Sequence, residues 1–445
     1  MSAPSPEGAS SMAAAHGRSG SERILVVSHR HPDFSLGGGE IAAYNLFRAY
    51  REHSAVSKAW FLASVDRGRG ANGGLMPRRD GEYLWEQGIH DWTMLKAADR
   101  RSVTQGFAEL IAALRPTIVH AHHYAHLGVE FLRVIKQVDP NIRICLTLHE
   151  YMGICNRQGQ MIKTSGRLCS RESFEDCRGC FPQLSVQDLW RRKQFIQRHF
   201  DYVDQFVSPS QFLRARYVQW GLDAGRITVI ENGQDDAPRV AARGVDAGGR
   251  RNRFGFFGQI NPFKGLDVLL KALHELPKAE RGRVVLEVHG ANLEAQAGDF
   301  QQSIKALAEP LIAKGIVKWG GPYQPHELRS RMANVDWVVV PSIWWENSPM
   351  VIQEAFVCGR PLLVSDIGGM AEKVEHGRDG LHVACGSPHA WGKALLAGTD
   401  PQLWQDCADS IRKPLTHADC ADRHLRIIKA GVVARTGVST GVSAE

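Results

Sequence analysis

The sequence predicts an α/β protein with two doubly wound, Rossmann-like domains that face each other across a cleft. Strand-like runs alternate with helical patterns from residue 23 to about residue 430, and one polar stretch rich in glycine and arginine interrupts them. Strands that alternate with helices form parallel sheets with right-handed crossovers. Doubly wound sheets bind ligands beyond the carboxyl ends of their strands, so two of them joined by a linker predict an interdomain site.

The elements follow from the apolar runs and their spacing. We expect strands at residues 24–28, 59–64, 118–122, 142–148, 205–208, 227–231, 254–257, 284–288, 316–319, 337–340 and 362–365. The predicted divisions are a disordered leader (1–22), an N-terminal Rossmann-like domain (23–235) with a cysteine-bearing insertion (152–183), a linker (236–252), a C-terminal Rossmann-like domain (253–430) and a disordered tail (431–445).

The composition is that of a globular protein, with 43% hydrophobic and 23% charged residues. No apolar run approaches the roughly 20 residues of a membrane-spanning helix, and the leader lacks the apolar stretch of a secretion signal, so we expect a cytoplasmic protein. The net charge of +7 favours anionic partners such as nucleotide diphosphates or an anionic membrane surface. No nucleic-acid-binding motif is present, so we expect no nucleic-acid partner.

Two glycine-containing loops follow predicted strands. Gly38 lies in a run of three glycines that opens a helix, where the backbone can approach a ligand and free N–H groups attract anions. Gly258 ends the first strand of the second domain, and Lys264 follows just before a helix, where it could reach a phosphate. The alternatives are an ordinary flexible turn and a solvated surface lysine.

A loop and helix after residue 340 form the strongest cluster of candidate residues. Glu346 lies in the loop, Ser348 is expected to cap the helix with Pro349 and Met350 in its first turn, and Glu354 lies further along. The helix N-terminus can face a phosphate. We expect one carboxylate near a sugar and the other to accept hydrogen bonds from ribose hydroxyls; the alternative is a capping loop with two surface glutamates.

The pair Glu346-x7-Glu354 resembles the signature of the family-four retaining glycosyltransferases, which have the GT-B fold. The order of the other motifs is also similar: Gly37-Gly38-Gly39-Glu40, Thr147-Leu148-His149-Glu150-Tyr151, Val207-Ser208-Pro209-Ser210-Gln211-Phe212, Glu231-Asn232-Gly233 and Gly258 through Lys264-Gly265. The resemblance covers nearly all of residues 23–430, and some relatives carry a similar cysteine-bearing insertion.

The resemblance implies transfer of a hexose-type sugar from a UDP- or GDP-sugar to a glycan or lipid-linked acceptor, with retention and without a catalytic metal, in surface polysaccharide biosynthesis. By position, Gly38 would lie near the diphosphate or the acceptor, and His149 would contact the transferred sugar. Lys264 would neutralise the leaving diphosphate. Glu346 and the backbone near Ser348–Met350 would hold the sugar, and Glu354 the ribose.

One departure concerns Gln259, which stands where this family usually has an arginine after the glycine. The donor site then loses one fixed positive charge, for which Arg253, Arg360 or the helix N-terminus could compensate. Two alternatives therefore stay open: a non-catalytic nucleotide-sugar-binding protein, and a sugar-nucleotide epimerase or hydrolase on the same fold. The second needs an acid–base pair of which the sequence shows no signature.

Three further clusters have two interpretations each. The cysteines of the insertion could hold a structural zinc or be unrelated thiols: Cys155, Cys169, Cys177 and Cys180. The histidines after residue 119 could bind a metal, but we favour a polar strand end facing the cleft: His120, His122, His123 and His126. The basic run 190–200 is a solvated helix face or, alternatively, a peripheral contact with anionic lipid at the inner face of the plasma membrane.

Overall fold

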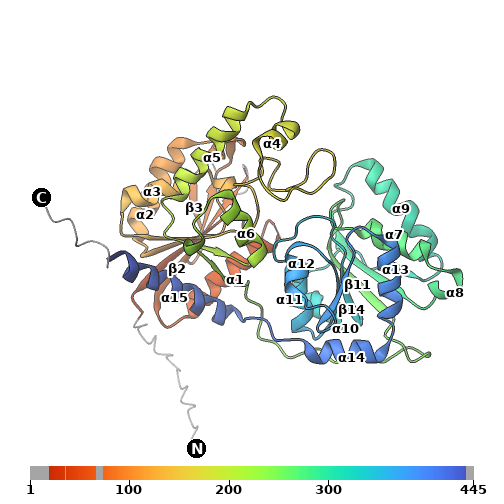
Figure 1. Ribbon diagram of the computed structural model, residues 1–445. Helices are drawn as coiled ribbons and strands as arrows, with labels where there is room; N and C mark the ends of the chain where they lie inside the picture. Colours follow the sequence, from red (N-terminus) through yellow and green to blue (C-terminus); the bar gives the residue numbers. More distant parts are fainter. Residues whose placement is uncertain (1–19, 36, 67–73, 437–445) are drawn as a thin grey trace, which may run out of the picture.

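The computed structural model describes residues 20–35, 37–66 and 74–436. It forms two α/β domains, each a sheet covered by helices on both faces (Figure 1). The predicted two doubly wound domains are therefore confirmed. Of the predicted disordered ends, residues 1–19 and 437–445 lie outside the described residues.

The N-terminal sheet has the strand order β10-β9-β8-β7-β1-β2-β4-β3, and its neighbours are parallel except for the antiparallel pair β3–β4. Its strands are β1 (Glu22–Ser28), β2 (Val56–Val65), β3 (Leu75–Arg79), β4 (Glu82–Glu86), β7 (Ile118–Ala121), β8 (Arg143–Thr147), β9 (Gln205–Ser208) and β10 (Ile227–Val229). A separate hairpin pairs β5 (Ile89–Asp91) with β6 (Lys96–Ala97). The helices are α1 (Gly38–Glu52), α2 (Ala108–Leu114), α3 (Phe131–Val138), α4 (Phe174–Cys180), α5 (Val186–Phe200) and α6 (Gln211–Trp220), with short helical turns at Ser102–Phe107, Ala125–Leu127 and Ala224–Arg226.

The C-terminal sheet is parallel throughout, in the order β13-β12-β11-β14-β15-β16. Its strands are β11 (Arg253–Gln259), β12 (Val285–Ala291), β13 (Val317–Trp319), β14 (Trp337–Val340), β15 (Leu362–Ser365) and β16 (Gly380–Val383). Its helices are α7 (Leu266–Glu275), α8 (Lys278–Arg281), α9 (Gly298–Ile312), α10 (Leu328–Ala333), α11 (Met350–Val357), α12 (Gly368–Lys373), α13 (Pro388–Ala397) and α14 (Pro401–Ser410), with a short turn at Pro325–Glu327.

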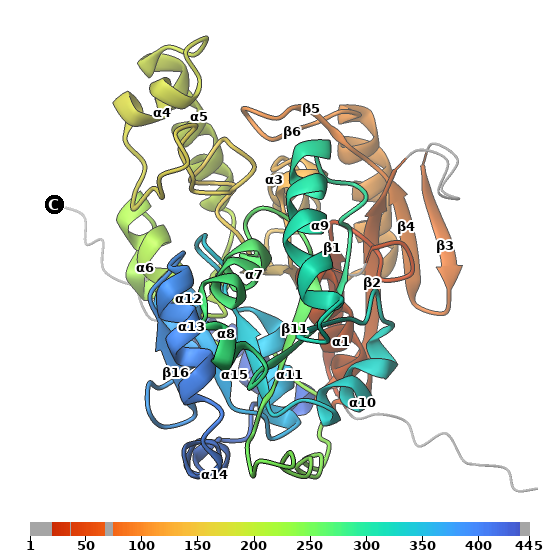
Figure 2. The ribbon, with the colours of Figure 1, turned by 90° about the vertical axis from the view of Figure 1, so that its right-hand side faces the viewer.

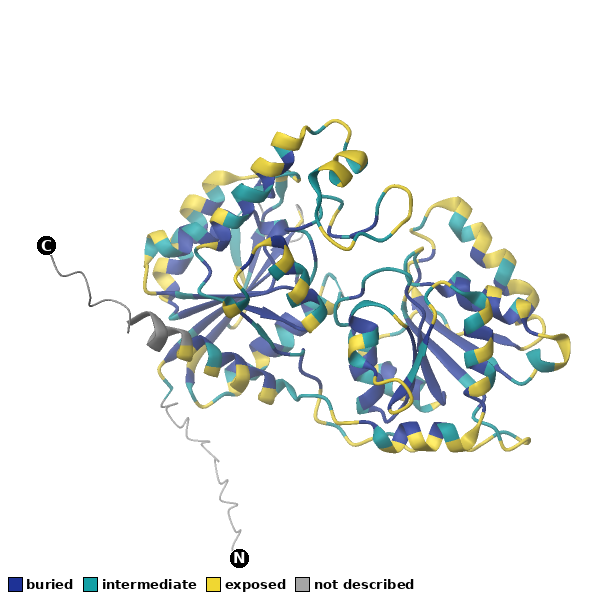
Figure 3. Ribbon diagram, viewed as in Figure 1, coloured by how far each residue is buried: buried dark blue, intermediate teal, exposed yellow. Residues whose placement is uncertain are grey.

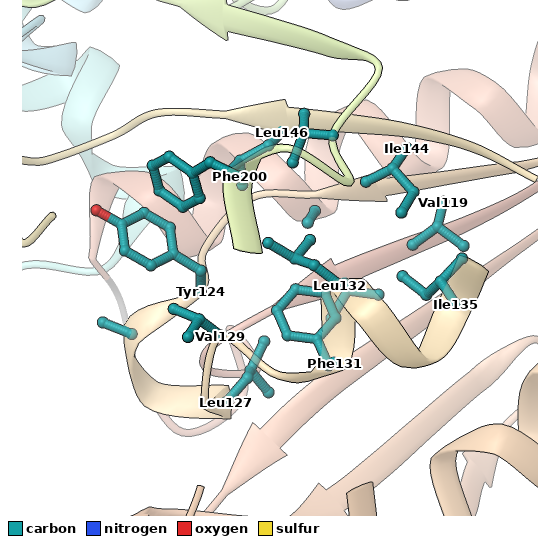
Figure 4. Packing of buried hydrophobic residues seen from close by; sticks show 14 of the residues in the cluster. Val119, Tyr124, Leu127, Val129, Phe131, Leu132, Ile135, Ile144, Leu146 and Phe200 are labelled. Atoms are coloured by element: carbon teal, nitrogen blue, oxygen red, sulfur yellow. The ribbon is translucent and has the colours of Figure 1, made fainter. Parts of the chain in front are cut away.

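The cores lie between the sheets and their covering helices, so the strands are buried and the outer helix faces are exposed (Figure 3). Figure 4 shows one such layer, in which Phe131 and Leu132 of α3 and Phe200 of α5 lie over Val119 and Leu146 of the sheet. Full burial of a side chain of this size contributes about 1.5–3 kcal/mol. Because both faces of a doubly wound sheet are covered, its strands read as continuous apolar runs, and this is why the sequence shows them clearly.

The last described helix, α15 (His417–Thr436), corrects the predicted division of the chain. We assigned residues 253–430 to the C-terminal domain, but α15 crosses back and lies along α1 of the N-terminal domain (Figure 1). Its Ala421, Leu425 and Ile428 pack in the same buried cluster as Leu46 of α1. The helix also continues into the predicted tail 431–445 as far as Thr436. The apolar side of a helix must be buried, and here α1 supplies the surface.

Both sheets place their topological switch point at the interdomain space. In the N-terminal sheet the strand order reverses between β1 and β7, and in the C-terminal sheet between β11 and β14. Loops beyond the carboxyl ends of strands at a switch point diverge and leave a crevice for a ligand. The loops after β1, β8, β11 and β14 hold the candidate residues.

Candidate active site

A cleft with a volume of about 720 Å³ lies between the two domains. The residues predicted to bind the donor or to take part in the reaction all line this cleft: Gly38, His149, Gly258, Gln259, Lys264, Glu346, Ser348, Pro349, Met350 and Glu354. They come from loops and helix ends far apart in the sequence. Direct hydrogen bonds join the two walls, since Ser210 donates to Asn347 over 2.6 Å and Asn347 donates to the backbone oxygen of His149 over 3.2 Å.

Glu346 and Lys264 form an ion pair in this cleft. Lys264 Nζ lies 2.6 Å from Glu346 Oε1, and the same oxygen accepts hydrogen bonds from Ser342 (2.8 Å) and Trp344 (2.7 Å). Burial by itself would raise the pKa of Glu346, but the ion pair with Lys264 and these hydrogen bonds outweigh it and hold the pKa below its ordinary value. Both groups are therefore charged and fixed in position.

The N-terminus of α11 opens into the cleft beside this pair. The helix begins at Met350, and Pro349 occupies the cap position without a side-chain hydrogen bond. We expected Ser348 to cap the helix, but its buried hydroxyl has no partner among the described groups, because the cap lies one residue later. The helix therefore presents uncapped N–H groups and a free hydroxyl, which suit an anion.

Glu354 lies further along α11 and also lines the cleft. Burial, assisted by the negative charge of Asp235, raises the pKa of its carboxyl to about 7. No described cation forms an ion pair with it, in contrast to Glu346. A carboxylate of this kind can accept hydrogen bonds from two neighbouring hydroxyl groups once it is ionised.

His149 faces the pair from the N-terminal domain. Burial and the neighbouring His29 lower its pKa to about 4, so the imidazole is neutral near pH 7. His149 Nε2 lies 3.0 Å from Nδ1 of His122, which is buried at the end of β7. This contact fixes the orientation of the ring. A neutral imidazole can exchange hydrogen bonds with a sugar hydroxyl without adding a charge.

The two predicted glycines lie at opposite walls. A Cβ atom on Gly38 would lie 3.3 Å from Cγ of Met350, so the start of α1 closely approaches the start of α11. Gly258 has φ +141°, which side chains rarely allow. Next to it, Gln259 is exposed in the cleft. Neither suggested compensating arginine supplies a charge here, because Arg253 pairs with Glu287 over 3.3 Å and the buried Arg360 binds backbone oxygens.

Among the ionisable residues that line the cleft, Arg329 and Glu150 received no role from the sequence. Arg329 of α10 donates from Nη2 to the backbone oxygen of Pro238 over 2.7 Å, and its Nη1 has no partner among the described groups. Burial raises the pKa of Glu150, next to His149, to about 7. Glu150 belongs to a motif quoted above, whereas Arg329 follows no strand and carried no sequence signal.

The other predicted clusters have different outcomes. Within residues 20–35, 37–66 and 74–436, no three His, Cys, Asp or Glu side chains are arranged to hold a metal. The four cysteines of the insertion are free thiols, so the zinc site stays a prediction. At the end of β7, the buried His120 bonds to Tyr50 (3.0 Å) and Thr147 (2.8 Å), and none of the four histidines predicted to face the cleft is among the described residues that line it.

The basic run 190–200 forms most of α5. Val186 and Trp190 are exposed on it, but Arg192 is buried and binds backbone oxygens of the insertion. No helix of the described chain is long and apolar enough to cross a membrane.

Comparison with known proteins agrees with the motif order. Residues 77–237 match the family described as Glycosyltransferase Family 4, and residues 243–407 match the glycosyl transferases group 1. A D-inositol 3-phosphate glycosyltransferase of Corynebacterium jeikeium (strain K411) is 31% identical over 40% of this chain and 42% of that protein. A lipopolysaccharide 1,2-N-acetylglucosaminetransferase of Salmonella typhimurium is 28% identical over 40% of this chain and 49% of that protein. The chain thus spans less than half the length of these curated relatives.

The crystal structure of HepE from Anabaena in complex with UDP-glucose has a similar fold, with a TM-score of 0.58, 17% sequence identity, and coverage of 94% of this chain and 100% of that chain. Together with the two facing doubly wound domains, this similarity defines the GT-B fold. Within that fold, the chain belongs to glycosyltransferase family 4, since the two matched segments together span most of residues 77–407.

Proposed function

We propose that the protein transfers a hexose-type sugar from a UDP- or GDP-sugar to a glycan or lipid-linked acceptor, with retention of the anomeric configuration. The observation that carries the proposal is the Lys264–Glu346 ion pair, which lies beside the uncapped start of α11 in a cleft that His149 also lines. Within the described chain, this arrangement joins a cation for a phosphate, an anion site and polar groups for a sugar.

The donor would lie along α11. Glu354 would accept hydrogen bonds from the ribose hydroxyls, and the N–H groups of the first turn, with the Ser348 hydroxyl, would bind the diphosphate. Because Lys264 is hydrogen-bonded to Glu346, its ammonium group would lie within reach of both the diphosphate and the sugar. The binding of UDP-glucose by HepE, which has the same fold, supports a nucleotide-sugar donor.

In the transfer, the bond between the anomeric carbon and the diphosphate oxygen breaks, and the acceptor hydroxyl oxygen bonds to the same carbon from the same face. The hydroxyl proton passes to the departing phosphate oxygen. Lys264 and the α11 N–H groups stabilise the growing negative charge, while Glu346 and His149 hold the sugar. The proposal assigns leaving-group stabilisation to these groups rather than to a catalytic metal.

We place the reaction in surface polysaccharide biosynthesis, at the inner face of the plasma membrane. The Salmonella relative is named as a lipopolysaccharide glycosyltransferase, and this name supports a cell-surface acceptor. Val186 and Trp190 are exposed on α5, whose Arg191 and Arg198 are also exposed. Such a face suits peripheral contact with anionic lipid.

The second candidate is a protein that binds the nucleotide sugar without turnover. Gln259 favours it, because the wall of the cleft there lacks a fixed cation. The intact Lys264–Glu346 pair favours catalysis.

A donor panel tests the proposal. Purified protein is mixed with UDP-, GDP- and ADP-sugars, and its melting temperature is compared with that of Glu354→Ala, Lys264→Ala and the surface control Lys278→Ala. A ligand that binds the native state raises the melting temperature. We expect one donor to stabilise the wild type and the control but not the cleft variants. If no sugar nucleotide stabilises the folded protein, the proposal is wrong.

The two candidates are separated by turnover. Hydrolysis or transfer of the bound donor is followed by NMR, where the anomeric coupling constant of the released or transferred sugar reports its configuration. Retained configuration supports the proposed transfer, inverted configuration contradicts it, and binding without any turnover favours the second candidate.

A further inference from the structure

A second cavity, of about 500 Å³, adjoins the donor cleft. It lies among the insertion, the β5–β6 hairpin, α5 and the loop after β11, and Gln158 lines both spaces. Figure 2 shows the insertion with α4 and the β5–β6 hairpin at one end of the molecule. The residues that line this cavity are Trp92, Leu95, Met152, Cys155, Asn156, Arg157, Gln158, Gln160, Phe181, Arg192 and Phe263.

The lining has two arginines and three amides but no acidic residue. Arg192 is 2% exposed and donates to the backbone oxygens of Gly153, over 2.6 Å, and of Met152. Arg157 donates to the backbone oxygen of Ile162 over 3.1 Å. Neither guanidinium forms an ion pair with a described carboxylate. A buried cation without a counterion is costly, and an anion in the cavity would offset that cost.

The carboxylates that interact electrostatically with Arg192 do not supply this counterion. Glu172 interacts with it electrostatically but pairs with Lys193 over 2.9 Å. Glu150 also acts on it from the donor cleft, yet burial raises the pKa of Glu150 to about 7, so this carboxyl is partly neutral near pH 7. The cavity therefore keeps an excess of positive charge.

The remaining lining suits a sugar ring. Trp92 is 45% exposed and contacts the ring of His126 edge-on, with centroids 5.1 Å apart. Amide side chains can bond to hydroxyls, and an aromatic face can pack on the apolar face of a pyranose. Phe263 stacks on Trp344 with centroids 5.2 Å apart, and Trp344 donates to Glu346, so the cavity is in contact with the loop that holds the transferred sugar.

We propose that this cavity is the acceptor site and that the acceptor residue bound there is an anionic saccharide, with its carboxylate or phosphate beside Arg157 and Arg192. Its ring packs on Trp92, and its reacting hydroxyl enters the donor cleft past Gln158. The inference rests on the proposed function, which it deepens by naming the class of acceptor. A neutral hexose would leave both arginines without a counterion, and a cationic sugar would be repelled.

The test measures binding of glucuronic acid, glucose 6-phosphate, inorganic phosphate and glucose to the full chain by ligand-observed NMR. We expect the two charged sugars to bind at least about tenfold more tightly than glucose, since hydrogen bonds to charged groups are the strong ones. The two sugars distinguish a carboxylate from a phosphate. Equal binding of glucose would overturn the inference, and binding of inorganic phosphate as tight as that of both sugars would reduce the site to an anion site.

Variants locate the binding. Arg157→Gln should weaken the charged sugars by about tenfold and leave glucose unchanged, and Trp92→Ala should weaken all sugars but not phosphate. Arg167→Gln, an exposed change elsewhere in the insertion, is the matched control. Arg157 is chosen because Arg192 anchors two backbone oxygens and its loss could unfold the insertion. Unchanged affinity in Arg157→Gln would contradict the inference.

The donor panel separates the two proposals. If a sugar nucleotide raises the melting temperature while charged sugars do not bind, the acceptor inference fails and the proposed function stands. If charged sugars bind at this cavity while no sugar nucleotide does, the proposed function fails.

Discussion

The C-terminal wall of the donor cleft and the cavity that adjoins the cleft differ in how their charges are paired. On the C-terminal wall, Glu346 is held by Lys264, Ser342 and Trp344, so charge and hydrogen bonds are matched within the protein. In the adjoining cavity, Arg157 and Arg192 have no described carboxylate partner. A matched site is rigid before its ligand arrives, whereas an unmatched one depends on the ligand for its counterion. Donor binding should therefore depend on geometry, and acceptor choice on charge.

The largest effect on turnover is expected from Lys264→Ala, which removes the cation of the Lys264–Glu346 ion pair. Turnover should fall by about 10²–10³, as it does when one donor to a developing negative charge is lost. Glu346 would also be left buried without its counterion, and its pKa should rise. Steady-state kinetics measure the loss, with Lys278→Ala as the control. A fall of less than about threefold would show that the pair has no part in the reaction.

A substitution in the buried side of α15 tests whether this helix is part of the N-terminal domain. Leu425 is 3% exposed and packs in the cluster shared with α1. Leu425→Ala should cost about 2–5 kcal/mol of stability. Hydrogen exchange should increase in β1 and α1 while β11 stays protected, and Leu395→Ala, in the core of the C-terminal domain, should give the reverse pattern. Faster exchange of β11 in Leu425→Ala would contradict the correction.

Glu354 should make the affinity for the donor depend on pH. Burial raises the pKa of its carboxyl to about 7, and the ionised form accepts hydrogen bonds from the ribose hydroxyls more strongly than the neutral form. Donor affinity should therefore rise as the pH increases from about 6 to 8, and Glu354→Gln should lower it by about tenfold at the higher pH. Calorimetric titration across this range measures both effects.

The same titration contains its own control. Glu150 has a pKa of about 7 in the same cleft, so any pH dependence that remains in Glu354→Gln is assigned to Glu150. If the full pH dependence survives in Glu354→Gln, Glu354 does not contact the donor.

The smallest effect is expected from His122, which touches His149 rather than the substrate. His122→Ala should lower kcat by about fivefold because the imidazole of His149 loses its fixed orientation. Donor affinity should stay within about twofold, and His122→Asn should restore part of the rate because its amide can replace the contact. Equal losses in kcat and donor affinity would indicate a structural role instead.

The sequence predicted the parts of the fold that depend on local patterns. Runs such as 337–340 and 362–365 agree with β14 and β15 because strands buried on both faces are largely apolar. It did not predict β3–β4, β5–β6 or β16. Of these, β3 and β16 are short edge strands, β5 and β6 form a separate hairpin, and β4 lies between β2 and β3 with Leu84 and Trp85 buried. Such segments gain their strand conformation from a neighbour, and no apolar run marks them.

The same division holds for the candidate site. The sequence motifs and the family resemblance they carry pointed to Gly38, His149, Lys264, Glu346 and Glu354, and all five line one cleft. Only the tertiary structure decided how they are partnered: Lys264 with Glu346, His149 with His122, and Ser348 with none of the described groups. It alone decided that α15 returns to the first domain and that Arg157 and Arg192 share a cavity without an acid. The physical reason is that chain pattern fixes local conformation, whereas contacts between distant segments and the charges they leave unpaired exist only once the domains pack.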